Sequence, residues 1–341
     1  MTCKKIFLVT CHVSLVTILL PLQITHPRTN FHVIKAPVIH PELKDFLARL
    51  KTVPAAASIE EQRRVWREFC LKNNHPPPAE ISVWDEALPL PDREIPLRCY
   101  MPEGKKPYPC VIYLHGGGWV LGDLDTQDTI AWGLAQGTEA LVISVAYRLA
   151  PEHPYPAAFE DSYAVLEHVV THADGFGIDP SRIALCGDSA GGTLAAALCL
   201  AARDRKGPQI AAQALLYPVM DTDTTRESYQ ENAESPLLTR AEMEHFLDAY
   251  LGNRRDDADA YALPLRAEDL TELPPAFVHT AEFDPLRDEG HLYYRRLREA
   301  GNEAEYRFAE GMPHSFARAR FEGPAARAEF DAVCAFLKRK L

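Results

Sequence analysis

The sequence predicts an α/β protein in which helices cover both faces of a mostly parallel sheet. From residue 81 onward, short and continuous apolar runs alternate with longer helix-like stretches. Such runs are typical of strands buried on both faces, and the stretches between them are typical of crossover helices. The predicted strands are 110–114, 140–146, 182–186, 210–216, 276–280 and 304–308, and the predicted helices between them include 158–171, 191–204 and 286–300.

Two helices are expected ahead of the sheet. The first, in residues 41–50, has an apolar stripe at helical spacing, formed by Leu43, Phe46, Leu47 and Leu50. Ser58 and Glu61 have the spacing of a capping box and predict the start of the second helix. One face of that helix is apolar and is made by Val65, Trp66 and Phe69. Prolines at 76–78 end it.

The core sheet is expected to begin with a hairpin of 81–88 and 94–100. The strand and helix alternation stops between 218 and 272, where the sequence is acidic and irregular apart from a capped helix at 238–251. This insertion and the first two helices suit a lid over the carboxyl ends of the strands, where open α/β sheets bind ligands. The predicted parts are a leader at 1–40, N-terminal helices at 41–80, a first core part at 81–217, the insertion at 218–272 and a second core part at 273–341.

Composition excludes several classes of protein. The 341 residues are 47% hydrophobic and 25% charged, a globular balance that excludes disorder and a polytopic membrane protein. The net charge is −12, and residues 41–341 hold all 48 acidic residues. A domain this acidic repels phosphate backbones, so we expect no nucleic-acid partner.

The first 40 residues are a different kind of sequence, with four basic residues and no acidic one. A basic start at Lys4 and Lys5 precedes an apolar run at 6–22, which is the pattern of a signal peptide or anchor. Polar interruptions and the lack of a small-x-small cleavage site favour instead a leader that belongs to no fold. Export or anchoring through residues 1–24 stays the alternative.

The eight cysteines predict reduced thiols. No pair has the C-x₂-C spacing of a zinc site or a redox centre. Most have apolar neighbours, which is typical of small core residues. We therefore expect a cytoplasmic protein without a metal.

The strongest chemical signal is a G-x-S-x-G motif, Gly187 to Gly191, centred on Ser189. It directly follows an apolar strand-like run and directly precedes an alanine-rich helix. This strand–turn–helix context is that of a nucleophile elbow, whose sharp turn lifts the serine hydroxyl above the sheet. The helix N-terminus also favours developing negative charge. The pattern predicts a nucleophilic Ser189, and Asp188 is expected to brace the turn.

A second motif, His115 to Trp119 with three consecutive glycines, follows another predicted strand. Acyl transfer passes through a tetrahedral oxyanion that needs unobstructed N–H donors, and an HGGG-type loop supplies them. Phosphate-binding glycine loops do not fit, because no Gly-Lys-[Ser/Thr] follows and Leu121 stands where the dinucleotide motif needs glycine.

A serine nucleophile needs a base and an acid that orients the base, and here both are expected later in the chain. Asp284 follows a predicted strand and precedes a proline, which favours it over the neighbouring acids Glu282 and Asp288. His314 follows the last predicted strand within a Gly-Met-Pro turn. Ser189, Asp284 and His314 are therefore the predicted catalytic set.

Two other patterns are assigned no chemistry. His168 and His172 have the i, i+4 spacing of metal ligands but lack the glutamate or third ligand of a metal motif. The proline-rich stretch 147–156 is interpreted as a bracing loop that offers an Arg148–Glu152 pair.

Five ordered motifs resemble the hormone-sensitive-lipase-like esterases, the bacterial family IV: HGGGW, YRLAPEHPYPAAFED, GDSAGG, EFDPLRDEG and GMPHSF. The resemblance covers roughly residues 41–341. It implies an α/β-hydrolase core with a helical cap, and hydrolysis of carboxyl esters with short to medium acyl chains. Residues 1–40 have no counterpart in the usual pattern, and Ser315 replaces a common glycine.

The resemblance implies a role for each matching residue. Ser189, Asp284 and His314 would form the triad, and the oxyanion hole would be made by the N–H groups of Gly117, Gly118 and Ala190. The substrate pocket is expected to be bordered by Trp119, Trp66 and Phe69. No cofactor is expected, the expected partner is a small-molecule ester, and a homodimer stays open. The alternatives are an amidase or deacetylase, or a non-catalytic binding homologue like the plant gibberellin receptors, which lack the catalytic histidine; the presence of His314 favours an enzyme.

Overall fold

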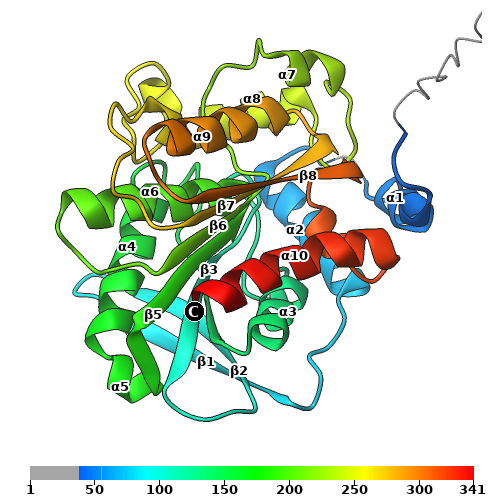
Figure 1. The fold of residues 1–341 in the computed structure, drawn as a ribbon. Coiled ribbons are helices and arrows are strands. Elements are labelled where there is room, and N and C mark those ends of the chain that lie inside the picture. The colour runs from blue at the N-terminus through cyan, green and yellow to red at the C-terminus, as the bar shows by residue number, and fades with distance from the viewer. Residues whose placement is uncertain (1–37, 55) are drawn as a thin grey trace, which may run out of the picture. The chain divides into compact units, whose positions relative to one another are not determined.

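A computed structural model describes residues 38–54 and 56–341 of the chain. Eight strands form one sheet in the order β1-β2-β4-β3-β5-β6-β7-β8 (Figure 1). Their bounds are β1 Ile81–Pro89, β2 Glu94–Pro102, β3 Tyr108–Leu114, β4 Leu141–Val145, β5 Ile178–Asp188, β6 Ala212–Leu216, β7 Ala276–Phe283 and β8 Ala304–Pro313. The predicted α/β class is confirmed, and each predicted strand and the hairpin overlap an observed one.

The sheet is parallel from β4 to β8 and antiparallel at its first edge. The hairpin of β1 and β2 pairs Ile81 with Pro102 and Pro89 with Glu94, and β2 then pairs antiparallel with β4. The pairs from β4 through β3, β5, β6 and β7 to β8 are all parallel. Because parallel strands end at the same edge, the loops that follow β3, β5, β7 and β8 come together there.

Helices cover both faces of the sheet (Figure 1). One face packs against α4 (Ala157–Thr171), α6 (Ala190–Asp204) and α9 (Arg287–Glu299), and the other against α3 (Asp128–Thr138) and α10 (Pro324–Lys340). In β3, Ile112 and Leu114 belong to the first core, whereas Val111 and Tyr113 belong to the second. This alternation explains the unbroken apolar run of a strand buried on both sides.

The helices near the carboxyl edge begin where their capping residues predict. Ser58 accepts a hydrogen bond from the Glu61 amide and starts α2 (Ile59–Asn73), and Thr239 and Glu242 form a full capping box on α8 (Arg240–Leu251). The other helices are α1 (Lys44–Leu50), α5 (Ala173–Phe176) and α7 (Glu227–Glu231). Between β6 and β7 the chain forms α7, α8 and short 3₁₀ turns instead of adding a strand.

The predicted Arg148–Glu152 pair is wrong. Arg148 instead binds Asp161 on α4, donating from its backbone amide and from two guanidinium nitrogens at 2.9–3.0 Å. Glu152 pairs with Arg63 of α2. Asp161 is almost fully buried and also accepts from Arg93, so it can hold two cations at once. The loop is thereby fastened to a core helix.

The predictions for the leader 1–40 and for an anchor at residues 1–24 fall almost wholly outside the described residues. Within the described part, no helix is both long and apolar enough to cross a membrane. Six cysteines lie in this part; all six are buried, and none of them forms a disulfide bond.

Replacing Asp161 with alanine should lower the free energy of unfolding by about 2–3 kcal/mol. This is less than the ~3–5 kcal/mol for one half of a fully buried pair, because both arginines are partly exposed. Urea unfolding of the purified protein measures the change. Asp331→Ala is a matched control, because its exposed pair with Arg327 should contribute less than about 0.5 kcal/mol. Equal effects of the two substitutions would contradict this account of the loop.

Candidate active site

Ser189 occupies the sharp turn between β5 and α6. Its backbone has φ 54° and ψ −122°, a region that costs about 1–3 kcal/mol for a residue with a side chain. The glycines on either side make the turn sterically feasible. A Cβ on Gly187 would lie 2.1 Å from the Gly191 carbonyl oxygen, and one on Gly191 would lie 1.9 Å from the Leu114 carbonyl oxygen. The G-x-S-x-G spacing is therefore a packing requirement here.

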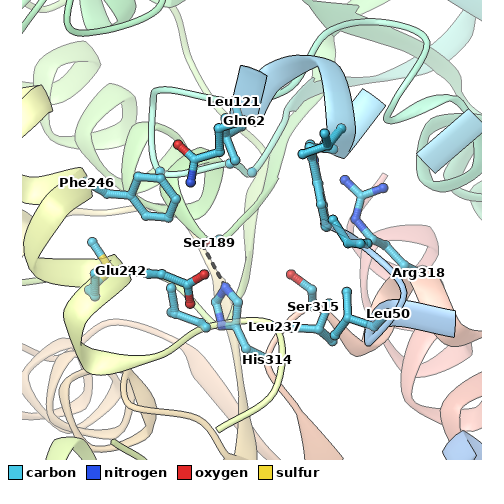
Figure 2. Close-up of a pocket in the computed structure, with 18 of the residues that line it drawn as sticks. Leu50, Gln62, Leu121, Ser189, Leu237, Glu242, Phe246, His314, Ser315 and Arg318 are labelled. Carbon is cyan, nitrogen blue, oxygen red and sulfur yellow. Dashed lines mark hydrogen bonds between the residues drawn. The ribbon is translucent and has the colours of Figure 1, made fainter. Parts of the chain in front are cut away.

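Three side chains from distant segments form a chain of hydrogen bonds. The Ser189 hydroxyl lies 2.9 Å from Nε2 of His314, and Nδ1 of His314 lies 2.7 Å from a carboxylate oxygen of Asp284. Figure 2 shows the bond between Ser189 and His314 at the floor of a cavity. With the ring proton on Nδ1 donated to Asp284, Nε2 is free to accept the serine proton. The structure thus brings together the three residues predicted from sequence.

The two competing acids have other partners. Glu282 accepts a hydrogen bond from the Gly311 amide at 2.6 Å, and Asp288 accepts one from the Ser228 amide at 2.8 Å. Asp284 itself is fully buried, and its second oxygen accepts from the Leu286 amide at 2.9 Å. Its carboxylate is thereby held in one orientation toward His314.

Tyr217 is a neighbour of the histidine that sequence reasoning missed. It follows β6 with a strained φ of 37°, and its ring meets His314 edge to face at 4.8 Å between centroids. The ring packs against the imidazole from the side and restricts its rotation. The position after a predicted strand end was a usable signal, because the loops after parallel strands converge.

The three residues predicted for the oxyanion hole have backbone amides that are free to donate a hydrogen bond. In the described part of the chain, the N–H groups of Gly117, Gly118 and Ala190 have no hydrogen-bond acceptor. Ala190 begins α6, so its N–H also lies at the positive end of a helix dipole. Gly117 and Gly118 have φ of 125° and 60°, which favours glycine at both positions.

Asp188 ties the elbow to the glycine loop, as expected of a brace. One of its oxygens accepts from the Gly116 amide at 2.9 Å and from the Tyr113 hydroxyl at 2.6 Å. Burial raises the pKa of Tyr113 well above its usual value, so this hydroxyl stays a donor. The nucleophile turn and the glycine loop are therefore held in a fixed relation.

His115, the first residue of the glycine motif, is structural. Burial lowers the pKa of this histidine, so the neutral ring is favoured. Its Nδ1 lies 2.9 Å from the Gly116 carbonyl oxygen, and the ring stacks on Tyr147 at 4.2 Å. These contacts of His115 hold the glycine loop in place.

Arg63 of α2 is a second residue that sequence reasoning missed. Its guanidinium donates to the carbonyl oxygens of Val120 and Ala150, both at 2.8 Å, and binds Glu152. The N-terminal helix is thus fastened to the turn that continues the glycine loop. Nothing in the spacing of the sequence points to these backbone acceptors.

A cavity of about 520 Å³ opens above Ser189. Its wall is largely apolar and comes mainly from two parts of the chain, the α1–α2 segment and the segment around α8 (Figure 2). Side chains on this wall include Leu50, Val65, Leu121, Leu238, Met243 and Phe246. A volume of this size suits a small-molecule ligand.

Of the three predicted pocket aromatics, only Trp66 lines this cavity. The expectation for Trp119 and Phe69 is corrected. Trp119 is fully buried and stacks on Tyr250 at 3.9 Å, and Phe69 packs between Trp66 and Phe46. Trp119 lies beyond the glycines at a positive φ of 58°, which turns its side chain into the core.

The histidine pair at the C-terminal end of α4, His168 on the helix and His172 just after it, has a local role. Nδ1 of His172 donates to the His168 carbonyl oxygen at 2.9 Å, and the two rings lie 4.2 Å apart. Across the described residues, no group of three or more histidine, cysteine or acidic side chains is arranged to hold a metal.

Comparison with known proteins places the chain in a family. A family model described as alpha/beta hydrolase fold matches residues 111–318. The chain is similar to the carboxylesterase NlhH of Mycobacterium tuberculosis, with 44% identity over 253 residues, 73% of this chain and 79% of that protein. It is also similar to an arylesterase of Saccharolobus solfataricus, with 37% identity over 68% of this chain and 76% of that protein.

A solved structure gives the same result. A thermostable esterase from Pseudomonas putida ECU1011 superposes with a TM-score of 0.84 and 32% identity, covering 90% of this chain and 99% of that one. Sequence and structure agree with the five motifs, so the chain belongs to the α/β-hydrolase family, in its hormone-sensitive-lipase-like branch of carboxylic ester hydrolases.

Proposed function

We propose that the protein is a serine carboxylesterase that hydrolyses short- to medium-chain acyl esters through Ser189, His314 and Asp284. The observation that carries the proposal is the hydrogen-bond chain from Ser189 through His314 to Asp284, which starts at the floor of a ligand-sized cavity. The amides of Gly117, Gly118 and Ala190 beside it support an oxyanion hole. For the location we propose the cytoplasm, because isolated cysteines with apolar neighbours are typical of reduced thiols.

The mechanism follows from the roles that these atoms can take. Ser189 attacks the ester carbonyl while His314 Nε2 takes the hydroxyl proton, and the three free amides stabilise the oxyanion. His314 then gives the proton to the departing alcohol, which leaves an acyl group on Ser189. Water, activated by the same histidine, releases the acid. Asp284 keeps the imidazole in the required tautomer and stabilises the imidazolium.

We propose that α1, α2 and the insertion at 218–272 act as a cap that selects the substrate. Both supply apolar side chains to the cavity wall, whereas the core loops supply the polar groups at its floor. The wall suits an acyl chain, and sharing a cavity of this size with the alcohol part favours a short or medium one.

Ser189→Ala should reduce kcat for p-nitrophenyl butyrate by about 10⁶-fold, the loss that removal of the nucleophile causes in other triad hydrolases. Stopped assays on purified protein measure the loss, and circular dichroism checks the fold. The matched control is Ser181→Ala, which removes a serine hydroxyl at the exposed start of β5 and should leave the rate near that of the wild type. A Ser189→Ala protein with near wild-type activity would refute the proposed nucleophile.

The acyl-chain preference is tested with p-nitrophenyl esters from acetate to palmitate. We expect kcat/KM to peak between butyrate and octanoate and to fall at least about tenfold, or ~1.4 kcal/mol, by palmitate. The physical reason is that the acyl chain shares the cavity with the alcohol part, so a long chain extends past the apolar wall and leaves apolar surface in contact with water. A maximum at palmitate would mean that the cap does not limit chain length.

A further inference from the structure

Arg318 on the cavity wall is a cation without an ion-pair partner in the described part of the chain. One terminal nitrogen, Nη1, donates to the Thr126 carbonyl oxygen at 2.8 Å and approaches the Cys70 sulfur at 3.5 Å. The guanidinium lies over the Trp66 ring at 5.2 Å, which holds its plane. Nε and Nη2 have no acceptor among the described residues, although each carries an N–H that can donate.

The two carboxylates that share the cavity wall are engaged elsewhere. Glu242 accepts from the backbone and hydroxyl of Thr239 in the capping box of α8, and Figure 2 places it across the cavity from Arg318. One oxygen of Asp188 accepts from Gly116 and Tyr113, and among the described residues neither of its oxygens lies within ion-pair distance of Arg318. Many partly buried arginines of the protein pair with a carboxylate, as Arg148 does with Asp161, whereas Arg296 and Arg320 donate only to backbone carbonyl oxygens. Of the arginines without an ion pair in the described part of the chain, Arg318 alone lines the cavity, where a bound anion would compensate its charge.

Ser315 adds a second unsatisfied donor on the same segment. It has a left-handed backbone at φ 59°, where glycine would be less strained, and its side chain faces the cavity (Figure 2). Its hydroxyl makes no hydrogen bond among the described residues. The short 3₁₀ helix Phe316–Ala319 joins Ser315 to Arg318, so both side chains follow His314 on one wall.

We propose that Ser315 and Arg318 form a subsite for a carboxylate on the alcohol part of the ester, so that acyl esters of hydroxycarboxylic acids are the preferred substrates. The inference rests on the proposed function. His314 must protonate the leaving oxygen, so the alcohol part lies on the side of His314, where these two residues stand. A guanidinium binds a carboxylate through charge-assisted hydrogen bonds, and a serine hydroxyl can donate one more.

The test compares 4-acetoxybenzoate with 4-acetoxybenzamide, which have the same acyl group and nearly the same size. Each kcat/KM is divided by the rate constant for hydroxide hydrolysis, and the ratio of the two corrected values measures the preference for charge. We expect a ratio of about ten or more in the wild type, as one charge-assisted hydrogen bond supplies. Arg318→Met should bring the ratio close to one, and Arg318→Lys should retain part of it.

Two further variants distinguish the subsite from effects on folding and on net charge. Ser315→Gly suits the left-handed backbone and removes only the donor, so it should lower the ratio several-fold in a folded protein. Arg298→Met is the matched control: Arg298 is exposed on α9 away from the cavity, and losing its charge should leave the ratio as in the wild type. A ratio that falls equally in Arg298→Met and Arg318→Met would overturn the subsite, because net charge alone would explain it.

The acyl side is tested with p-nitrophenyl hemisuccinate against p-nitrophenyl butyrate. An effect of Arg318→Met on this pair alone would overturn the assignment to the alcohol part. Equal corrected rates for the benzoate and the benzamide in the wild type would overturn the subsite and leave the esterase proposal standing.

Binding separates the two proposals. Calorimetry with Ser189→Ala protein should show tighter binding of 4-acetoxybenzoate than of 4-acetoxybenzamide, and this difference should disappear in the double variant with Arg318→Met. If the wild type cleaves no ester, the proposed function fails, while this measurement still decides whether a carboxylate is bound at Arg318.

Discussion

The strained turn at Ser189 is the constraint on which the rest of the site depends. A residue with a side chain stays at φ 54° only when its surroundings hold it there. Here the buried strand β5 and the buried helix α6, on either side of Ser189, hold the turn in place. The turn also brings Gly191 so close to the end of β3 that only a hydrogen atom fits there, and the Gly191 carbonyl group leaves equally little space at Gly187. The glycine loop after β3 is then within reach of Asp188, which fixes the distance between nucleophile and free amides.

The parallel sheet turns sequence distance into spatial proximity. Ser189, Asp284 and His314 follow β5, β7 and β8, and all three strands end at the same edge. The acid and base are therefore placed by strand order, and the final alignment comes from short-range contacts. The Leu286 amide orients Asp284, and the ring of Tyr217 confines the imidazole. Backbone topology and side-chain packing thus act at different length scales.

The features that could be predicted from sequence are those marked by a short-range pattern of residues. Strands buried on both faces, the capping residues of α2 and α8, and the three residues on the carboxyl edge all leave patterns within a few positions. Contacts between distant segments leave none: Trp119 stacks on Tyr250, and Arg148 binds Asp161 instead of the nearer Glu152. The helix α10 was not predicted, although Pro324 opens it and Phe330, Val333 and Leu337 follow at helical spacing. That signal was present and was missed, whereas the acceptors of Arg63 are backbone atoms that no residue type marks.

The origin of the cavity wall has a consequence for how such a protein can diversify. Most of the wall is drawn from residues 50–54, 56–66 and 237–246, whereas the reacting groups and free amides come from loops of the core. Mutations in those two stretches can alter which esters fit and leave the elbow geometry intact, since neither stretch contributes a strand to the sheet. Arg63 is the exception, because it lies in the first stretch and also holds the glycine loop. Substitutions that change substrate choice can therefore accumulate at most positions of these two stretches, whereas a substitution at Arg63 also affects the glycine loop.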